Sequence, residues 1–210
     1  MRILNVPRSS RLPTPAALAL AAALLVPWTA GAEPATATAR EAEEFAAAAE
    51  AALRDRLFHE LFHSVFWNAI NLTLDMNFTP DDRNLSVLPM FHIGGIGLFT
   101  LPVLYTGGAV VIQRTFDPAE TLRLLKEEKI TLFFGVAAVF LFLIQHSDFN
   151  AEAFENVRVV MSGGAPLPES LVRQYHQAGI VLQQGFGMSE AAPSIATLSK
   201  DLALEKAGSI

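Results

Sequence analysis

Apolar and polar positions follow two alternating periods along most of the chain. From residue 64 onward, short apolar runs that suit buried strands are separated by longer stretches whose apolar residues recur at helical spacing. The pattern predicts helices over 65–76, after Gly95, and over 118–128, 136–146 and 168–177, with strands over 84–88, 109–113, 131–134, 157–161 and 180–183. Such alternation predicts an α/β fold in which a sheet is layered with helices.

The first 63 residues have a different pattern. Residues 1–38 place three arginines before the apolar stretch 12–28 and a small-residue cleavage site at 30–32, which is typical of a secretory signal peptide. Three prolines leave too short an apolar span for a membrane anchor. A transit peptide and a fusion of unrelated pieces are the alternatives. Residues 39–63 are charged and alanine-rich, which indicates a solvated helix or linker.

Composition narrows the class of protein. With 210 residues, of which 51% are hydrophobic, the chain is long enough for one domain with a buried sheet. The net charge of −6 argues against a nucleic-acid partner. Because the chain has no cysteine, a disulfide scaffold and a thiolate zinc site are excluded.

The segment 183–190 carries the first candidate chemistry. Its two glycines predict a turn at the carboxyl end of a strand, where open α/β sheets bind their ligands. Phe186 offers a ring that can stack on a base, and Ser189 offers a hydroxyl for a phosphate oxygen. Glu190 offers the hard oxygen ligand that Mg²⁺ prefers. The segment therefore favours a nucleotide and its metal as ligands.

Two further glycine pairs follow predicted strands. Gly163 and Gly164 come directly after the apolar run 157–161, and a second pair follows His92 at the end of the run 84–88. Both pairs let the backbone approach a ligand closely. An isolated histidine such as His92 is more often a core residue than a catalyst, but three such loops in order favour a shared site.

The three loops together resemble a known family. LPMFHIGG at 88–95, SGGAPL at 162–167 and QGFGMSE at 184–190 are similar to motifs of the AMP-forming acyl-CoA synthetases, in the adenylate-forming superfamily. The resemblance covers 64–210 and implies the large N-terminal domain of these ligases. It implies that a small carboxylic acid, fatty or aromatic, is activated by ATP as an acyl-adenylate and then transferred to coenzyme A. ATP, Mg²⁺ and coenzyme A are the implied co-substrates.

The resemblance also assigns roles to residues of this sequence. Phe186 takes the adenine-stacking place usually held by tyrosine, and Ser189 takes a place usually held by threonine. Glu190 is the implied Mg²⁺ ligand, and His92 is implied to lie beside the incoming carboxylate. These two residues are the implied catalytic residues. The other implied nucleotide-binding residues are Gly163, Gly164, Ala165, Pro166, Gln184, Gly185, Gly187 and Met188.

Departures from the family limit the implied activity. Its Ser/Thr/Gly-rich phosphate loop, which ends in lysine, has no counterpart in 39–62, and the chain ends before the ribose-binding aspartate and the C-terminal domain with its lysine. We therefore expect 64–210 to be a partial AMP-binding domain, inactive by itself, with a missing domain or partner chain. A non-catalytic nucleotide- and acyl-binding remnant is the alternative. Ala137 replaces a proline that is usual in the family. The family implies the cytoplasm, whereas the N-terminus is typical of secretion, so the compartment stays open.

A rival hypothesis concerns a metal. His59, Glu60 and His63 satisfy the pattern His-Glu-x-x-His on a predicted helix, which would place two imidazoles on one face with a glutamate as general base. This pattern predicts a secreted zinc hydrolase, although no third ligand stands out in the sequence. The zinc content of the purified protein would test it.

Overall fold

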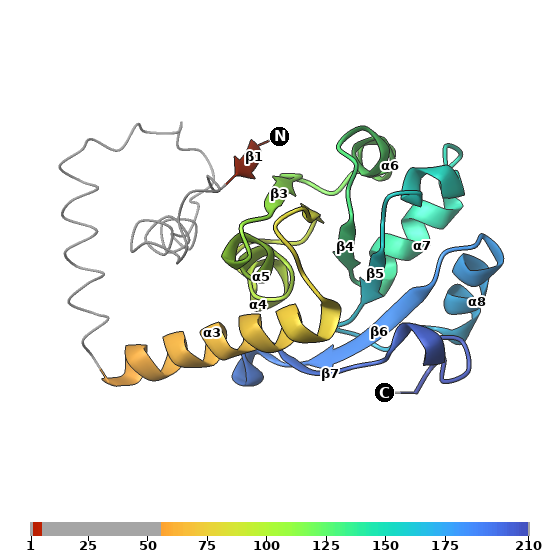
Figure 1. Ribbon diagram of the computed structural model, residues 1–210. Coiled ribbons are helices and arrows are strands. Elements are labelled where there is room, and N and C mark those ends of the chain that lie inside the picture. The colour runs from red at the N-terminus through yellow and green to blue at the C-terminus, as the bar shows by residue number, and fades with distance from the viewer. Residues whose placement is uncertain (1, 6–55, 210) are drawn as a thin grey trace.

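The computed structural model describes residues 2–5 and 56–209, with side chains from Phe62 onward (Figure 1). The strands are β1 (Arg2–Asn5), β2 (Arg83–Ser86), β3 (Ala109–Ile112), β4 (Leu132–Gly135), β5 (Val159–Ser162), β6 (Leu182–Gly187) and β7 (Ser194–Thr197). The α-helices are α3 (Arg56–Met76), α4 (Ile93–Ile96), α5 (Thr100–Tyr105), α6 (Pro118–Glu127), α7 (Ala137–Gln145) and α8 (Glu169–Gln177), with 3₁₀ turns η1 (Ala151–Phe154), η2 (Ser189–Ala191) and η3 (Lys200–Leu202).

A seven-stranded sheet in the order β1-β3-β2-β4-β5-β6-β7 organises these elements. The strands from β3 to β6 pair in parallel, whereas β1 and β7 pair antiparallel at the two edges. The α/β fold expected from the hydrophobic pattern is therefore confirmed. Every inner strand ends at the same edge of the sheet, so the loops that follow these strands are brought together.

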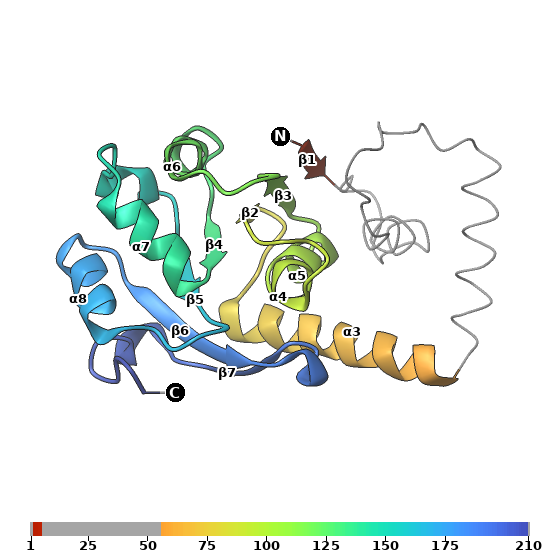
Figure 2. The same ribbon diagram turned by 180° about the vertical axis from the view of Figure 1, so that it is seen from behind.

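Helices cover both faces of the sheet (Figures 1 and 2). On one face, α6, α7 and α8 bury side chains such as Leu125, Phe140 and Tyr175 in one core cluster. On the other face, α3 and α5 contribute Leu72 and Val103 to a second cluster. The inner strands are buried on both faces, which explains why their sequences are nearly continuous apolar runs.

Side-chain caps and prolines set several helix boundaries. At the start of α6, the side chain of Asp117 accepts a hydrogen bond of 2.8 Å from the Glu120 N–H, and Pro118 occupies the first turn. An aspartate cap followed by proline is a strong signal for a helix start, and the sequence predicts this start correctly. Pro168 occupies the N-cap position of α8, where no side chain caps the helix.

The main difference from the sequence-based prediction concerns β6. The sequence predicts a strand that ends at 183 and a glycine turn beyond it, but β6 continues to Gly187, so the predicted turn is wrong. The extension is stabilised by β7, which pairs antiparallel with the last three residues of β6. β7 is only four residues long and has no strong apolar alternation, so the sequence gives no signal for it.

The segments before residue 64 are described only in part. Helix α3 begins at Arg56, so it includes the end of the predicted linker 39–63. Of the signal-like segment 1–38, the structure describes Arg2–Asn5 as the edge strand β1, and the rest of that prediction lies outside the described residues. Among the described helices, none has the length and apolar character needed to cross a membrane.

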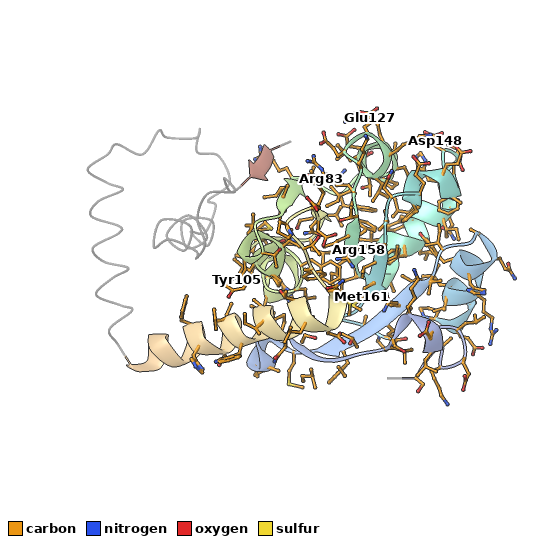
Figure 3. All side chains as sticks on the ribbon, viewed as in Figure 1. Arg83, Tyr105, Glu127, Asp148, Arg158 and Met161 are labelled. Carbon is orange, nitrogen blue, oxygen red and sulfur yellow. The ribbon has the colours of Figure 1, made fainter. Side chains whose placement is uncertain are left out.

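An ion pair between Arg158, labelled in Figure 3, and the buried Asp82 joins the end of α3 to the amino-terminal ends of the strands. Asp82, 3% exposed, accepts bonds from Arg158 Nε at 2.9 Å and from the Thr131 hydroxyl at 2.7 Å. Arg158 also donates to the carbonyls of Met76 and Asn77, each at 2.8 Å. Burial alone would raise the pKa of Asp82, but these hydrogen bonds outweigh it and hold that pKa below its usual value.

Candidate functional site

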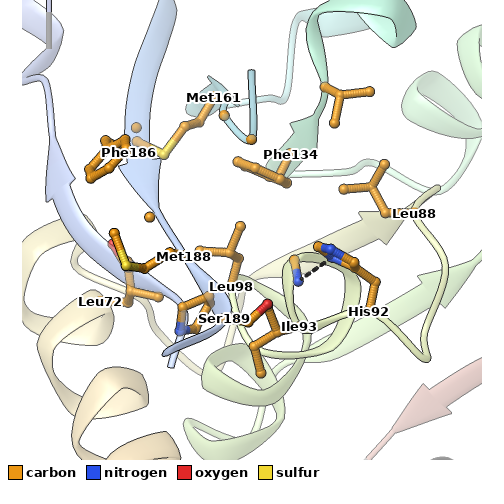
Figure 4. A pocket seen from close by; sticks show the side chains of 18 of the residues that line it. Leu72, Leu88, His92, Ile93, Leu98, Phe134, Met161, Phe186, Met188 and Ser189 are labelled. Atoms are coloured by element: carbon orange, nitrogen blue, oxygen red, sulfur yellow. Dashed lines mark hydrogen bonds between the residues drawn. The ribbon is translucent and has the colours of Figure 1, made fainter. Parts of the chain in front are cut away.

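A cavity of about 240 Å³ lies at the carboxyl ends of β2, β4, β5 and β6 (Figure 4). Loops that follow these strands form most of its walls, and α3 and β7 complete them. The lining residues are Leu72, Leu88, His92, Ile93, Gly94, Leu98, Phe134, Val136, Met161, Gly163, Gly164, Gly185, Phe186, Gly187, Met188, Ser189, Pro193, Ser194 and Thr197. The three motif loops predicted from the sequence therefore meet at one place.

The Gly163-Gly164 loop leaves the sheet directly after β5. Gly164 has a φ of +81°, in the left-handed region that favours glycine, and this conformation turns the chain across the cavity. Gly163 and Gly164 both line the cavity, whereas Ala165 and Pro166 are exposed and lie outside its lining. Leu167 is buried and anchors the loop to the core.

The end of β6 and the residues after it form a second wall. Phe186 is 45% exposed and lines the cavity, so its aromatic ring is accessible to a flat ligand. Figure 4 shows Phe186 and Met188 across the cavity from Leu88 and His92. The Met188 N–H donates to the Pro193 carbonyl at 2.9 Å, which fixes this segment to the start of β7. Glu190 follows in η2, is exposed, and lies outside the lining.

Gln184 does not line the cavity. It lies in β6 opposite Ser162 of β5, and both side chains are buried. Gln184 Oε1 and Ser162 Oγ have no hydrogen-bond partner within the described part of the chain. Buried polar atoms without a partner are destabilising, so these two oxygens call for a donor from water or a ligand. They immediately precede Gly185 and Gly163, which do line the cavity.

His92 is held by the backbone of the loop that it begins. Its Nδ1 accepts a hydrogen bond of 3.0 Å from the Gly94 N–H, which caps the short helix α4 (Figure 4). His92 is the one titratable side chain in the lining of this cavity. Among the side chains of the described lining, a bound anion would therefore meet the imidazole of His92 but no lysine or arginine.

Several lining residues were missed by the motif-based reading. Phe134 and Met161 lie at the ends of β4 and β5, so the rule that ligands bind at strand ends could have found them. Leu72 comes from α3 and Thr197 from β7, and neither carries a local signal. Phe134 packs against Phe99 with ring centroids 5.6 Å apart, so this apolar wall is supported by the core.

The zinc hypothesis finds no support among the described side chains. Helix α3 includes the whole His-Glu-x-x-His pattern, but the side chains of His59 and Glu60 lie outside those described. His63 Nε2 accepts a hydrogen bond of 2.8 Å from the Trp67 indole. The described residues contain no group of three side chains able to hold a metal ion.

The whole site lies within a recognisable family segment. Residues 59–210 match the family model described as AMP-binding enzyme. The chain is 34% identical over 143 residues to feruloyl-CoA synthase of an Amycolatopsis species, and 35% identical over 144 residues to indoleacetate–CoA ligase of Aromatoleum aromaticum. Each match covers 68% of this chain but only 29% and 28% of the relatives. The chain therefore spans less than a third of the length of these curated relatives.

Solved structures support the same relationship. The o-succinylbenzoate CoA synthetase of Bacillus subtilis, solved with its acyl-adenylate intermediate, is 28% identical with a TM-score of 0.62. That match covers 70% of this chain and 30% of the synthetase. ATP-bound MatB of Rhodopseudomonas palustris is 26% identical with a TM-score of 0.61, covering 66% of this chain and 27% of MatB.

Proposed function

Since the chain belongs to the AMP-binding enzyme family, as part of the N-terminal region of an AMP-forming acyl-CoA synthetase, we propose that its cavity binds ATP beside a carboxylic acid. The main support for this proposal is that the three loop segments 88–94, 163–164 and 185–189 all line one cavity. A carboxylate oxygen would attack the α-phosphorus of ATP and release pyrophosphate. The thiol of coenzyme A would then attack the acyl carbon, and AMP would leave.

The adenine fits between Phe186 and the Gly163-Gly164 loop. Phe186 supplies an exposed aromatic face, and the glycines supply backbone without side chains that would block a flat ring. The oxygens of Gln184 and Ser162 that lack a partner belong to the residues just before Gly185 and Gly163, and an exocyclic amino group is a donor of the kind that they lack. Stacking and these acceptors together favour a purine that carries an amino group.

The acid fits the apolar part of the cavity. Its walls include Leu88, Phe134 and Met161, and no acidic or basic side chain other than His92 contributes to the lining. These apolar side chains suit an aromatic ring or a short hydrocarbon chain that carries one carboxylate. The names of the feruloyl and indoleacetate ligases, which both refer to aromatic acids, support this class of substrate.

His92 would contact the carboxylate of the acid, and Glu190 would act at the phosphates of ATP. His92, already held by the Gly94 N–H, would contact the carboxylate of the acid. Glu190 is an exposed carboxylate one residue beyond the cavity lining, and Mg²⁺ is commonly held by one or two carboxylates together with substrate phosphates. A bound Mg²⁺ would offset the repulsion between the anionic acid and the phosphates. Residues Ser189 and Glu190 thus fit the phosphate end of the nucleotide.

Calorimetric titration of the 210-residue chain with Mg-ATP tests the proposal. Saturable binding is expected, and it should weaken in Glu190→Ala and when the metal is chelated. Glu169→Ala removes another exposed carboxylate, on α8 outside the cavity lining, and should bind like the parent. The absence of binding by the folded parent chain would refute the assignment.

A second assay separates catalysis from binding. Pyrophosphate release is measured with ATP and a panel of aromatic and short aliphatic acids. Release would show that the chain activates acids. Binding of ATP without release would instead support the non-catalytic binding module that the missing phosphate loop favours.

A further inference from the structure

One buried side chain outside the cavity lining connects the wall that carries His92 with the wall that carries Phe186. Asn68 on α3 is 6% exposed. Its Nδ2 donates to the Gly97 carbonyl at 3.0 Å, and its Oδ1 accepts from the Ser194 N–H at 3.0 Å. These partners lie 29 and 126 residues away in the sequence. A single amide therefore joins α3, the end of α4 and the start of β7.

The bond to Gly97 fixes the wall that carries His92. Gly97 closes α4, and its N–H donates to the Ile93 carbonyl at 2.7 Å. His92 caps the other end of the same four-residue helix. Because the helix is a single turn, a fixed Gly97 also fixes the position of His92 in the cavity wall.

The bond to Ser194 fixes the opposite wall. Ser194 directly follows Pro193, whose carbonyl accepts the Met188 N–H at 2.9 Å. Pro193 also lies against the end of α4, because a Cβ placed on Gly97 would lie only 3.0 Å from Pro193 Cδ. The segment that bears Phe186 and Met188 is thus held through Pro193 and Ser194 to the same amide.

We propose that Asn68 is a positioning residue that sets the spacing between the His92 wall and the Phe186 wall. This inference rests on the proposed function, in which the acid contacts the first wall and the nucleotide contacts the second. An asparagine amide supplies one donor group and one acceptor group at the right places. Asn68→Asp keeps the volume and the acceptor for Ser194, but turns an oxygen toward the Gly97 carbonyl. Asn68→Ala leaves both backbone groups without their partner.

Two ligands distinguish positioning from general destabilisation. In the proposed arrangement AMP would contact Phe186 and the Gly163-Gly164 loop but not the His92 wall, whereas a benzoyl-sulfamoyl adenosine, a stable analogue of an acyl-adenylate, would also contact the His92 wall. In calorimetry, Asn68→Ala should lower the affinity for the analogue by about tenfold or more and the affinity for AMP by less than about threefold. Asn71→Ala, an exposed asparagine on the same helix, should leave both affinities unchanged.

The outcomes separate the two proposals. If the parent binds neither ligand, the proposed function fails and the inference fails with it. If the parent binds both and Asn68→Ala binds both equally well, or loses both equally, only the positioning role is overturned. Asn68→Asp should also lose more affinity for the analogue than for AMP. It replaces Asn68→Ala in the test if Asn68→Ala does not fold.

Amide hydrogen exchange supplies a readout that needs no ligand. The Ser194 N–H should exchange faster in Asn68→Ala, because its acceptor is lost, but not in Asn71→Ala or Asn68→Asp. Unchanged exchange at Ser194 in Asn68→Ala would overturn the proposed connection.

Discussion

Arg158→Ala tests how α3 is held to the sheet. The substitution removes two hydrogen bonds to Asp82, at 2.9 and 2.5 Å, and the bonds to the Met76 and Asn77 carbonyls. Asp82 would remain buried, with the Thr131 hydroxyl and the backbone N–H and hydroxyl of Thr79 as its remaining donors. A carboxylate that has lost its counter-ion in this way destabilises the folded state.

The expected loss follows from the burial of the pair. Breaking a buried ion pair by removing one partner costs about 3–5 kcal/mol. The side chain of Arg158 is 36% exposed, so water screens part of the interaction and the lower end, about 3 kcal/mol, is expected. In a domain of this size each kcal/mol lowers Tm by about 2–4 °C, which gives a decrease of about 6–12 °C. This loss is a large part of the roughly 5–15 kcal/mol that stabilises a typical domain.

Urea unfolding followed by far-UV circular dichroism measures this loss. Arg173→Ala is the matched control, because Arg173 pairs with Glu169 one turn away and both side chains are 53% exposed. The control should lose less than about 1 kcal/mol. If Arg158→Ala is no less stable than the control, the network does not hold α3 to the sheet.

The same pair predicts a pH dependence. Because the pKa of Asp82 is lower in the folded protein than the unfolded value of about 3.9, the ionised carboxylate contributes its full stabilisation above that value. This contribution is lost as the pH falls through the lowered folded pKa. The difference in stability between the parent and Arg158→Ala should therefore narrow in strong acid and stay constant near neutrality.

Substitutions at three further positions test the core and the site. Tyr175→Phe removes the bond of 2.8 Å from the buried hydroxyl to the Phe140 carbonyl and should cost about 1 kcal/mol in urea unfolding. In Gly187→Ala the new Cβ would lie 1.9 Å from the Pro193 carbonyl oxygen, so the pairing of β6 with β7 should be lost, as seen by amide exchange, and ATP binding with it. Phe186→Ala should weaken ATP binding by about 1–3 kcal/mol in calorimetry while Phe186→Tyr retains it, and equal affinities in all three proteins would contradict stacking.

The fold was predictable wherever local signals and burial agreed. The strand predicted over 131–134 and the helix predicted over 118–128 differ by at most one residue at each end from β4 and α6. These signals depend on neighbouring residues alone, so the sequence contains them in full. The edge strands β1 and β7 differ, because their stability depends on pairing with β3 and β6 and not on an apolar pattern of their own.

The part of the candidate site formed by loops after the strands was predictable from the sequence, and the part formed by α3 was not. His92 and Gly163 follow strands that end at one edge, so their meeting could be expected from topology. The contribution of α3 could not be expected, because it depends on tertiary contacts such as the bond between Asn68 and Ser194. The turn predicted beyond residue 183 failed for a related reason, since pairing with β7 keeps residues 185–187 extended.

The hydrogen bond at His92 Nδ1 determines where this ring can carry its proton. A nitrogen that accepts the Gly94 N–H has no hydrogen of its own, so the neutral imidazole is the tautomer protonated at Nε2. In that tautomer the second nitrogen is a donor, suited to hold an oxygen anion and unsuited to remove a proton.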